Sequence, residues 1–168
     1  MKNKTKYLLG DIGNTYTKVV LLDKKFNIIK SQNFDSKMLY KKNKISFFFK
    51  KLITSSLNRK ILFSSVVPII YNNIRMYLKK KGFKPYEIKD LDINKIIEIK
   101  IDNFKQAGSD RIVNAIGSYS TYKSNCLVID FGTATISDMV PNGGEQPWDD
   151  IGVTGEHGTP EQGVASPH

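Results

Sequence analysis

The sequence has one cysteine, few arginines and no long apolar run. A single cysteine, Cys126, excludes an internal disulfide and fits a reducing cytoplasm. Cys126 opens an apolar segment, which favours a small buried side chain over a nucleophile. No segment is long and apolar enough to span a bilayer, and the N-terminal apolar run ends at Asp11 without a cleavage site. We therefore expect a cytoplasmic protein with neither a membrane anchor nor a signal peptide.

The scarcity of arginine argues against nucleic-acid binding, although the net charge is +10. Arginine is the residue that usually reads bases or clamps phosphates, and only Arg59, Arg75 and Arg111 are present. The excess charge is scattered lysine. The lysines at 79–81 end a predicted helix, where cations favour the helix dipole. A basic nucleic-acid-binding protein is therefore the lowest-ranked interpretation.

Residues 139–168 contain no lysine or arginine. All 26 basic residues lie in 1–138, whereas 139–168 hold five acids, half of the 12 glycines and four of the six prolines. This segment has no helical or strand periodicity, so a loop or disorder is expected there. It is either a natural linker or foreign sequence, for example from a frameshift, joined to a truncated domain. The abrupt loss of lysine favours foreign sequence.

The segment Tyr7–Leu22, YLLGDIGNTYTKVVLL, organises the rest of the chain. Two apolar runs with strand propensity flank a turn of small and polar residues. Turn glycines allow close backbone approach, and successive N–H groups form a nest for anionic oxygens. Asp11 beside a phosphate requires a cation between them, so the loop predicts phosphate plus divalent metal; an ordinary hairpin turn explains it about equally well. The candidate phosphate ligands are Gly13, Asn14, Thr15 and Lys18.

Periodicity along the chain predicts an α/β arrangement. The near-continuous apolar run at 59–67 is typical of a buried parallel strand. Residues 126–131 also predict a buried strand, and Gln106–Arg111 predicts a loop. Beyond the first hairpin, the expected strands are 26–34, 59–67, 86–89, 96–101, 126–131 and 134–140, and the expected helices are 36–56, 68–81 and 110–123.

A second strand–turn–strand echoes the first one. VIDFGTATISD, at 128–138, repeats the order of LLGDIGNTYTK, at 8–18: an apolar strand, an aspartate, a glycine and a threonine, then a strand. Two such hairpins that face each other would hold a nucleotide phosphate chain from both sides.

Four motifs together resemble the type III pantothenate kinase family. They are Asp11–Thr15 with Lys18, Ser64–Pro68, Gly108–Arg111, and Asp130–Thr135 with Asp138. The resemblance covers residues 6–138, about half or slightly more of a usual member. It implies an actin-like, ribonuclease-H-like ATPase fold, with a first lobe at 1–105, the start of a second, incomplete lobe at 106–140, and a non-matching tail at 141–168.

The resemblance implies ATP-dependent phosphorylation of pantothenate to 4′-phosphopantothenate, the first step of coenzyme A biosynthesis, by a homodimer with Mg²⁺ and a monovalent cation (K⁺ or NH₄⁺). Phosphoryl transfer depends mostly on positioning and charge neutralisation. The resemblance implies that Asp11 binds Mg²⁺, that Asp130 lies at the monovalent-cation site and that Asp110 is the general base. It implies that Gly108 and Arg111 bind the substrate. The implied phosphate contacts are Gly13, Asn14, Thr15, Lys18, Gly132, Thr133 and Thr135.

The residues also allow a structural role for Asp110 and depart from the family pattern in two places. Asp110 stands where a helix N-cap is expected, a common structural use. Ile136 replaces a threonine that the family usually repeats after Thr135, and the segment after residue 140 lacks the glycine-rich adenosine-contacting sequence of the second lobe. We therefore expect either a kinase, whole or truncated and inactive alone, or a non-catalytic ATPase-fold protein.

Overall fold

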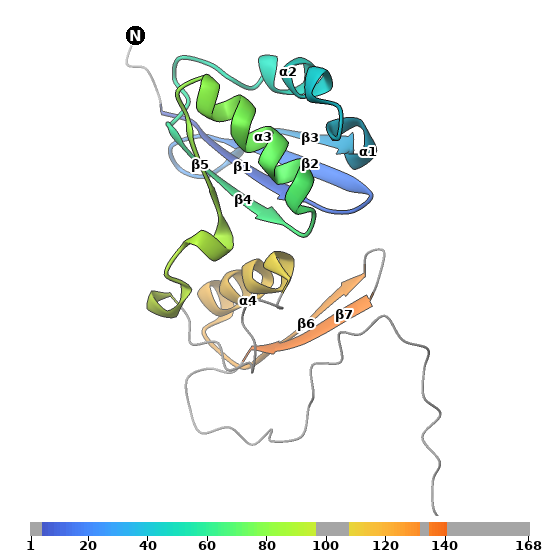
Figure 1. Cartoon of the computed structure of the whole chain (residues 1–168). Helices are drawn as coiled ribbons and strands as arrows, with labels where there is room; N and C mark the ends of the chain where they lie inside the picture. The colour runs from blue at the N-terminus through green and yellow to red at the C-terminus, as the bar shows by residue number, and fades with distance from the viewer. Residues whose placement is uncertain (1–4, 97–107, 132–134, 141–168) are drawn as a thin grey trace, which may run out of the picture.

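A computed structural model describes residues 5–96, 108–131 and 135–140 (Figure 1). Its main feature is a mixed five-stranded sheet in the order β3-β2-β1-β4-β5. The first three strands are antiparallel neighbours, whereas β4 runs parallel to both β1 and β5. This arrangement is typical of the first lobe of an actin-like ATPase, as expected from the sequence. The strands are β1 (Tyr7–Ile12), β2 (Tyr16–Leu22), β3 (Ile28–Asp35), β4 (Lys60–Ser65) and β5 (Lys84–Glu87).

The two faces of the sheet differ because side chains alternate along each strand. On β1, Leu8, Gly10 and Ile12 are buried on one face, and Asp11 lies on the other. On β4, Phe63 is fully buried on the same face as Gly10. A Cβ at Gly10 would overlap the Phe63 ring, so glycine is required there for close packing.

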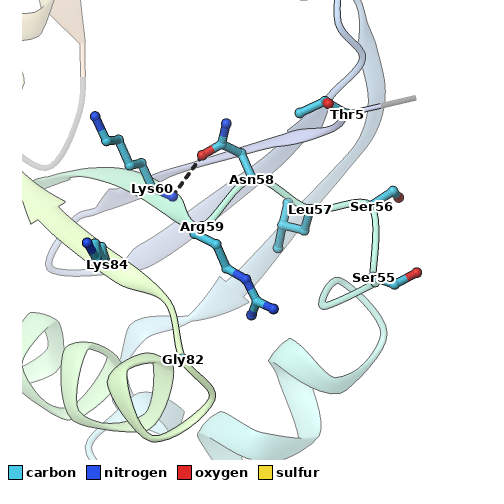
Figure 2. A pocket seen from close by; sticks show the side chains of 9 residues that line it. All are labelled: Thr5, Ser55, Ser56, Leu57, Asn58, Arg59, Lys60, Gly82 and Lys84. Atoms are coloured by element: carbon cyan, nitrogen blue, oxygen red, sulfur yellow. Dashed lines mark hydrogen bonds between the residues drawn. The ribbon is translucent and has the colours of Figure 1, made fainter. Parts of the chain in front are cut away.

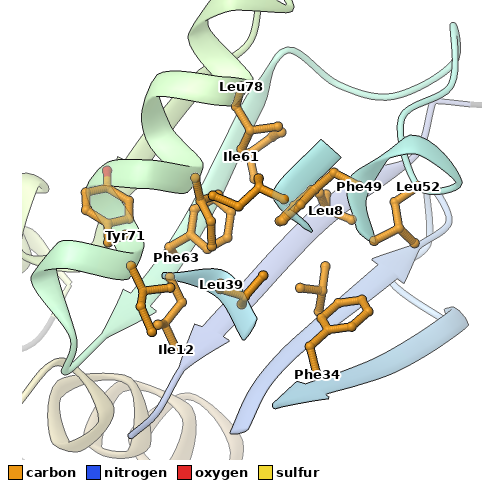
Figure 3. Close-up of a cluster of buried hydrophobic side chains, with 14 of the residues drawn as sticks. Leu8, Ile12, Phe34, Leu39, Phe49, Leu52, Ile61, Phe63, Tyr71 and Leu78 are labelled. Carbon is orange, nitrogen blue, oxygen red and sulfur yellow. The ribbon is translucent and has the colours of Figure 1, made fainter. Parts of the chain in front are cut away.

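Two long helices, α2 (Lys42–Lys50) and α3 (Pro68–Lys80), cover the first face (Figure 1). Figure 3 shows the apolar core that fills the space between them and the sheet. The helix α3 begins at Pro68, whose missing N–H is tolerated in the first turn. It is followed by Gly82, which has a φ of +78°. Both ends agree with the sequence prediction.

The helix expected over 36–56 is instead two helices, α1 (Ser36–Leu39) and α2. Leu39, Ile45 and Phe49 are all fully buried. In one straight helix, Leu39 and Ile45 would project about 120° apart at roughly 100° per residue. The break at 40–41 allows both side chains to reach the same core.

The chain then crosses to the second face of the sheet. After β5 come two short 3₁₀ helices, η1 (Ile88–Asp90) and η2 (Ile93–Lys95), and later α4 (Ser109–Tyr122). Ile112 of α4 forms a buried cluster with Ile88 and Ile93, and Leu62 of β4 packs against this cluster. Leu62 lies on the opposite face from Phe63, so α4 covers part of the second face.

The last described elements, β6 (Cys126–Phe131) and β7 (Thr135–Val140), form an antiparallel hairpin that contacts α4. The hairpin agrees with the prediction, but the expected burial of β6 is wrong. Leu127 is 61% exposed and Ile129 is 50% exposed. The described chain places α4 against this hairpin and provides no second layer over those side chains.

The strand expected at 86–89 is β5, which begins at Lys84 and gives way to η1. Most of the strand expected at 96–101 and residues 106–107 of the expected loop lie outside the described residues. Residues 109–111 of that loop are instead the first residues of α4, so the loop expected there is wrong. None of the described helices has the length and apolar character needed to cross a membrane.

Candidate functional site

The turn between β1 and β2 lies at the end of the sheet that is formed by the C-terminal ends of β1 and β4. Gly13 is half-buried, and Asn14 and Thr15 are exposed. The Gly13 N–H donates to the Tyr16 carbonyl at 3.0 Å, which closes the turn. The turn therefore presents small and polar residues to solvent, as the sequence predicts for a phosphate-binding loop.

Asp11 and Lys18 are opposite each other on neighbouring strands. They are register partners in the antiparallel β1–β2 ladder, and both are exposed on the second face of the sheet. Directly opposite residues have Cβ atoms about 4.5–5.5 Å apart. The carboxylate predicted to bind a metal and the ammonium predicted to bind a phosphate are thus close to each other.

Asp110 and Arg111 lie in the first turn of α4. The N-cap residue is Gly108 and makes no side-chain cap, so the expectation that Asp110 is the N-cap is wrong. The Asp110 Oδ1 accepts a hydrogen bond from the Arg111 N–H at 2.9 Å. A Cβ at Gly108 would overlap the Asp110 carboxylate, so a larger residue there would require the Asp110 side chain to shift.

Packing of α4 brings the Asp110 turn to the sheet face that carries Asp11. Ile112, in the same turn as Asp110, packs near Leu62. Strand alternation puts Leu62 and Asp11 on the same face of the sheet. Two acids that are 99 positions apart in the sequence therefore lie on one side of the fold.

Two buried hydroxyls at this place have no hydrogen-bond partner within the described part of the chain. Ser64 Oγ is on β4, where Ser64 is the register partner of Asp11, and Ser109 Oγ is in the first turn of α4. Ser64 is 7% exposed and Ser109 is 1% exposed. An unsatisfied buried hydroxyl costs about 1–3 kcal/mol, so the described residues leave the hydrogen bonding of these two groups incomplete.

The second predicted loop is described only at its two ends. The backbone of Asp130 pairs with Ile136, and that of Phe131 pairs with Thr135. Gly132 and Thr133 lie outside the described residues. The phosphate and monovalent-cation roles predicted for this loop therefore stay predictions.

A pocket of about 560 Å³ lies at the opposite end of the sheet, beside the first residues of β4 and β5 (Figure 2). Its basic lining residues are Arg59, Lys60 and Lys84. None of the predicted site residues lines it. Arg59 is also held over the Phe83 ring, 5.1 Å from its centroid.

Comparison with known proteins identifies the family. The sequence model of a family described as type III pantothenate kinase matches residues 7–146. The chain belongs to the type III pantothenate kinase family. The match ends shortly after the predicted break in composition and leaves residues 147–168 outside it.

Several relatives named type III pantothenate kinase support this membership. The one from Pelagibacter ubique is 43% identical over 138 residues, covering 79% of this chain and 53% of the relative. The one from Desulforapulum autotrophicum is 32% identical over 146 residues, covering 82% of this chain and 55% of the relative. The one from Fervidobacterium nodosum is 30% identical over 139 residues, covering 81% of this chain and 54% of the relative. The chain spans about half the length of these relatives.

Proposed function

We propose that the chain carries the nucleotide-binding first lobe and the general base of a kinase that phosphorylates pantothenate with ATP. The observation that carries this proposal is the common location of Asp11 and the Asp110 turn on one side of the sheet. Family membership supports the substrate, because the relatives are named type III pantothenate kinases. The buried hydroxyls of Ser64 and Ser109 support a polar ligand at the same place.

In this proposal the γ-phosphoryl group passes from ATP to the hydroxyl of pantothenate. The hydroxyl oxygen forms a bond to the γ-phosphorus, the bond to the leaving ADP oxygen breaks, and the hydroxyl proton moves to the Asp110 carboxylate. Asn14, Thr15 and Lys18 contact the phosphates with the Gly13 backbone. Arg111 and Gly108 shape the substrate side.

The donor set of the first loop fits Mg²⁺. No group of three or more His, Cys, Asp or Glu side chains gathers in the described ranges in a way that would form a protein-only metal cage. Mg²⁺ is usually held by one or two carboxylates together with substrate phosphates, and exposed Asp11 beside a phosphate loop meets that requirement. The ion would neutralise charge on the phosphates. A monovalent cation at Asp130 and a homodimeric assembly, as in the family, belong to the same proposal.

Substitution of the proposed base tests this function. Asp110→Asn keeps the size of the side chain but removes the proton acceptor, so turnover of pantothenate should fall about 10²–10⁴-fold while ATP binding changes little. The matched control is Asp23→Asn. Asp23 lies in the β2–β3 turn, where it accepts hydrogen bonds from Lys25 and Asn27, and its substitution should leave turnover unchanged.

The readouts are ADP release with pantothenate, ATP and Mg²⁺, and calorimetric titration with ATP·Mg²⁺. Measurable and equal turnover in Asp110→Asn and the unaltered chain would overturn the role of Asp110. ATP binding without any turnover in the unaltered chain would favour the non-catalytic ATPase-fold alternative. Absence of ATP binding would contradict both the kinase proposal and the non-catalytic ATPase-fold alternative.

A further inference from the structure

A chain of buried and part-buried hydrogen bonds lies beneath the β1–β2 turn. Ser36, the first residue of α1, donates its hydroxyl to the Gly13 carbonyl at 2.7 Å. Its backbone N–H donates to the Thr15 carbonyl at 2.9 Å. The Thr17 and Ser36 hydroxyls are 3.0 Å apart, and both residues are fully buried. One residue from a distant part of the sequence therefore holds two carbonyls of the turn.

The direction of each hydrogen bond follows from the number of available protons. A carbonyl only accepts, so the single hydroxyl proton of Ser36 is used on Gly13. The hydroxyl of Thr17 must then be the donor in its contact with Ser36. The order is Thr17 to Ser36 to Gly13, and each hydroxyl proton in the buried chain is used.

Capping of α1 does not explain the Ser36 hydroxyl. That task belongs to Asp35, whose Oδ1 accepts from the Lys37 N–H at 2.8 Å. The Ser36 side chain instead points its proton at the turn. Its contribution is therefore to the shape of the turn rather than to the start of the helix.

The two anchored carbonyls determine where the following N–H groups point. In a trans peptide the C=O and the next N–H point in opposite directions, and the described residues contain no cis peptide. With the Gly13 and Thr15 carbonyls directed toward Ser36, the N–H groups of Asn14 and Tyr16 are directed away from it. Both N–H groups therefore lie on the side of the turn that faces away from Ser36, and backbone donors in a turn suit an anion.

We propose that Ser36, with Thr17 behind it, is a positioning residue that holds the Gly13–Tyr16 turn in the conformation that receives the nucleotide phosphates. The inference rests on the proposed kinase function, because that function makes this turn a phosphate loop. The inference adds to that function the buried hydroxyls of Ser36 and Thr17, which act through the backbone of the turn and not by touching a substrate.

The first variant is Ser36→Ala, studied in the full chain. Loss of the hydroxyl leaves the part-buried Gly13 carbonyl without its donor, which should weaken ATP·Mg²⁺ binding about tenfold. The Gly13 amide, which donates to Tyr16, should exchange with solvent at least about tenfold faster, because the turn opens more often. The Lys6 amide, which donates to Ser56 at the opposite edge, should keep its rate. Ser46→Ala is the matched control, since its hydroxyl bonds the Asn43 carbonyl on the surface of α2.

A second pair of variants separates hydrogen bonding from packing and covers the case in which Ser36→Ala does not fold. Thr17→Val keeps the shape of the side chain but loses the hydroxyl, whereas Thr17→Ser keeps the hydroxyl and loses a methyl group. The inference expects weaker ATP·Mg²⁺ binding and faster Gly13 exchange in Thr17→Val than in Thr17→Ser. A merely structural packing role predicts the reverse order.

The outcomes distinguish the inference from the proposed function. If the unaltered chain binds ATP·Mg²⁺ and Ser36→Ala binds it equally well with unchanged Gly13 exchange, the positioning role is wrong and the kinase proposal stands. If the unaltered chain binds no ATP·Mg²⁺, the proposed function fails and takes this inference with it. Weaker binding together with faster exchange, confined to Ser36→Ala and Thr17→Val, supports the inference.

Discussion

The five-stranded sheet and the β6–β7 hairpin both contain apolar strands, but the apolar side chains of the two regions are buried to different degrees. Ile61 and Phe63 of β4 are fully buried. Leu127 of β6 is 61% exposed. The sheet has α2 and α3 over one face and α4 over part of the other, whereas in the described residues the hairpin is contacted by α4. The difference teaches that strand sequence alone does not make a core, because a two-stranded hairpin needs another layer.

The largest expected effect comes from truncating one apolar side chain in each region. Phe63→Ala removes a fully buried ring that packs against Gly10 and Tyr71, so the free energy of unfolding should fall by about 3–5 kcal/mol. Leu127→Ala, at a mostly exposed site, should change it by less than about 1 kcal/mol. Urea unfolding of both variants measures the contrast. Similar losses would mean that β6 is covered in solution.

A smaller effect is expected at high pH in the core of the sheet region. Burial, followed by the negative charge of Asp90, raises the pKa of Tyr71 to about 12. A raised pKa in the folded state stabilises the fold below pH 10, and this stabilisation is lost as the pH rises toward 12. Relative to Tyr71→Phe, the unaltered chain should therefore lose up to about 2 kcal/mol of unfolding free energy between pH 10 and pH 12.

Denaturation of both proteins across this pH range measures that difference, and groups other than Tyr71 cancel in the comparison. Near neutral pH, Tyr71→Phe should be neutral or slightly stabilising, because the Tyr71 hydroxyl has no hydrogen-bond partner in the described structure. Parallel pH profiles for the two proteins would contradict the raised pKa.

The smallest effect is expected in α4, which joins the two regions. Gly117 lies inside α4, and a Cβ there would meet no atom within 4 Å. Gly117→Ala should therefore stabilise α4 by about 0.5–1 kcal/mol through helix propensity. Amide hydrogen exchange in Gly117→Ala shows which elements become more stable. Slower exchange in α4 and β6 with unchanged β1 rates would show that the two regions open separately, and equal slowing in both would show one cooperative unit.

Local patterns in the sequence were enough to predict much of the fold. Alternation in β1 and β2, Pro68 at the start of α3 and Gly82 after its end act over short distances, so they could be recognised without knowing the neighbours. The single helix expected over 36–56 was wrong, because the break depends on where the core lies relative to Leu39 and Ile45. The exposure of β6 was missed for the same reason.

The candidate site also contains some residues that the sequence predicted and others that it did not. Asp11, Gly13 and Lys18 were predicted from one hairpin, and Gly108, Asp110 and Arg111 from one motif, because each set is contiguous. The roles of Ser36 and Thr17 were not predicted. Serine after Asp35 looks like part of a helix start, and no spacing signal connects it with a turn more than 20 residues earlier.

The sequence by itself determined most of the order of strands and helices, the two hairpins and the motifs that indicate the type III pantothenate kinase family, because these depend on the chemistry of neighbouring residues. Only the tertiary structure decided that Asp110 lies on the same side of the sheet as Asp11, and that Ser36 holds the Gly13 carbonyl. Such contacts join residues far apart in the chain, and they form only when burial of apolar side chains such as Ile112 and Phe63 brings the elements together.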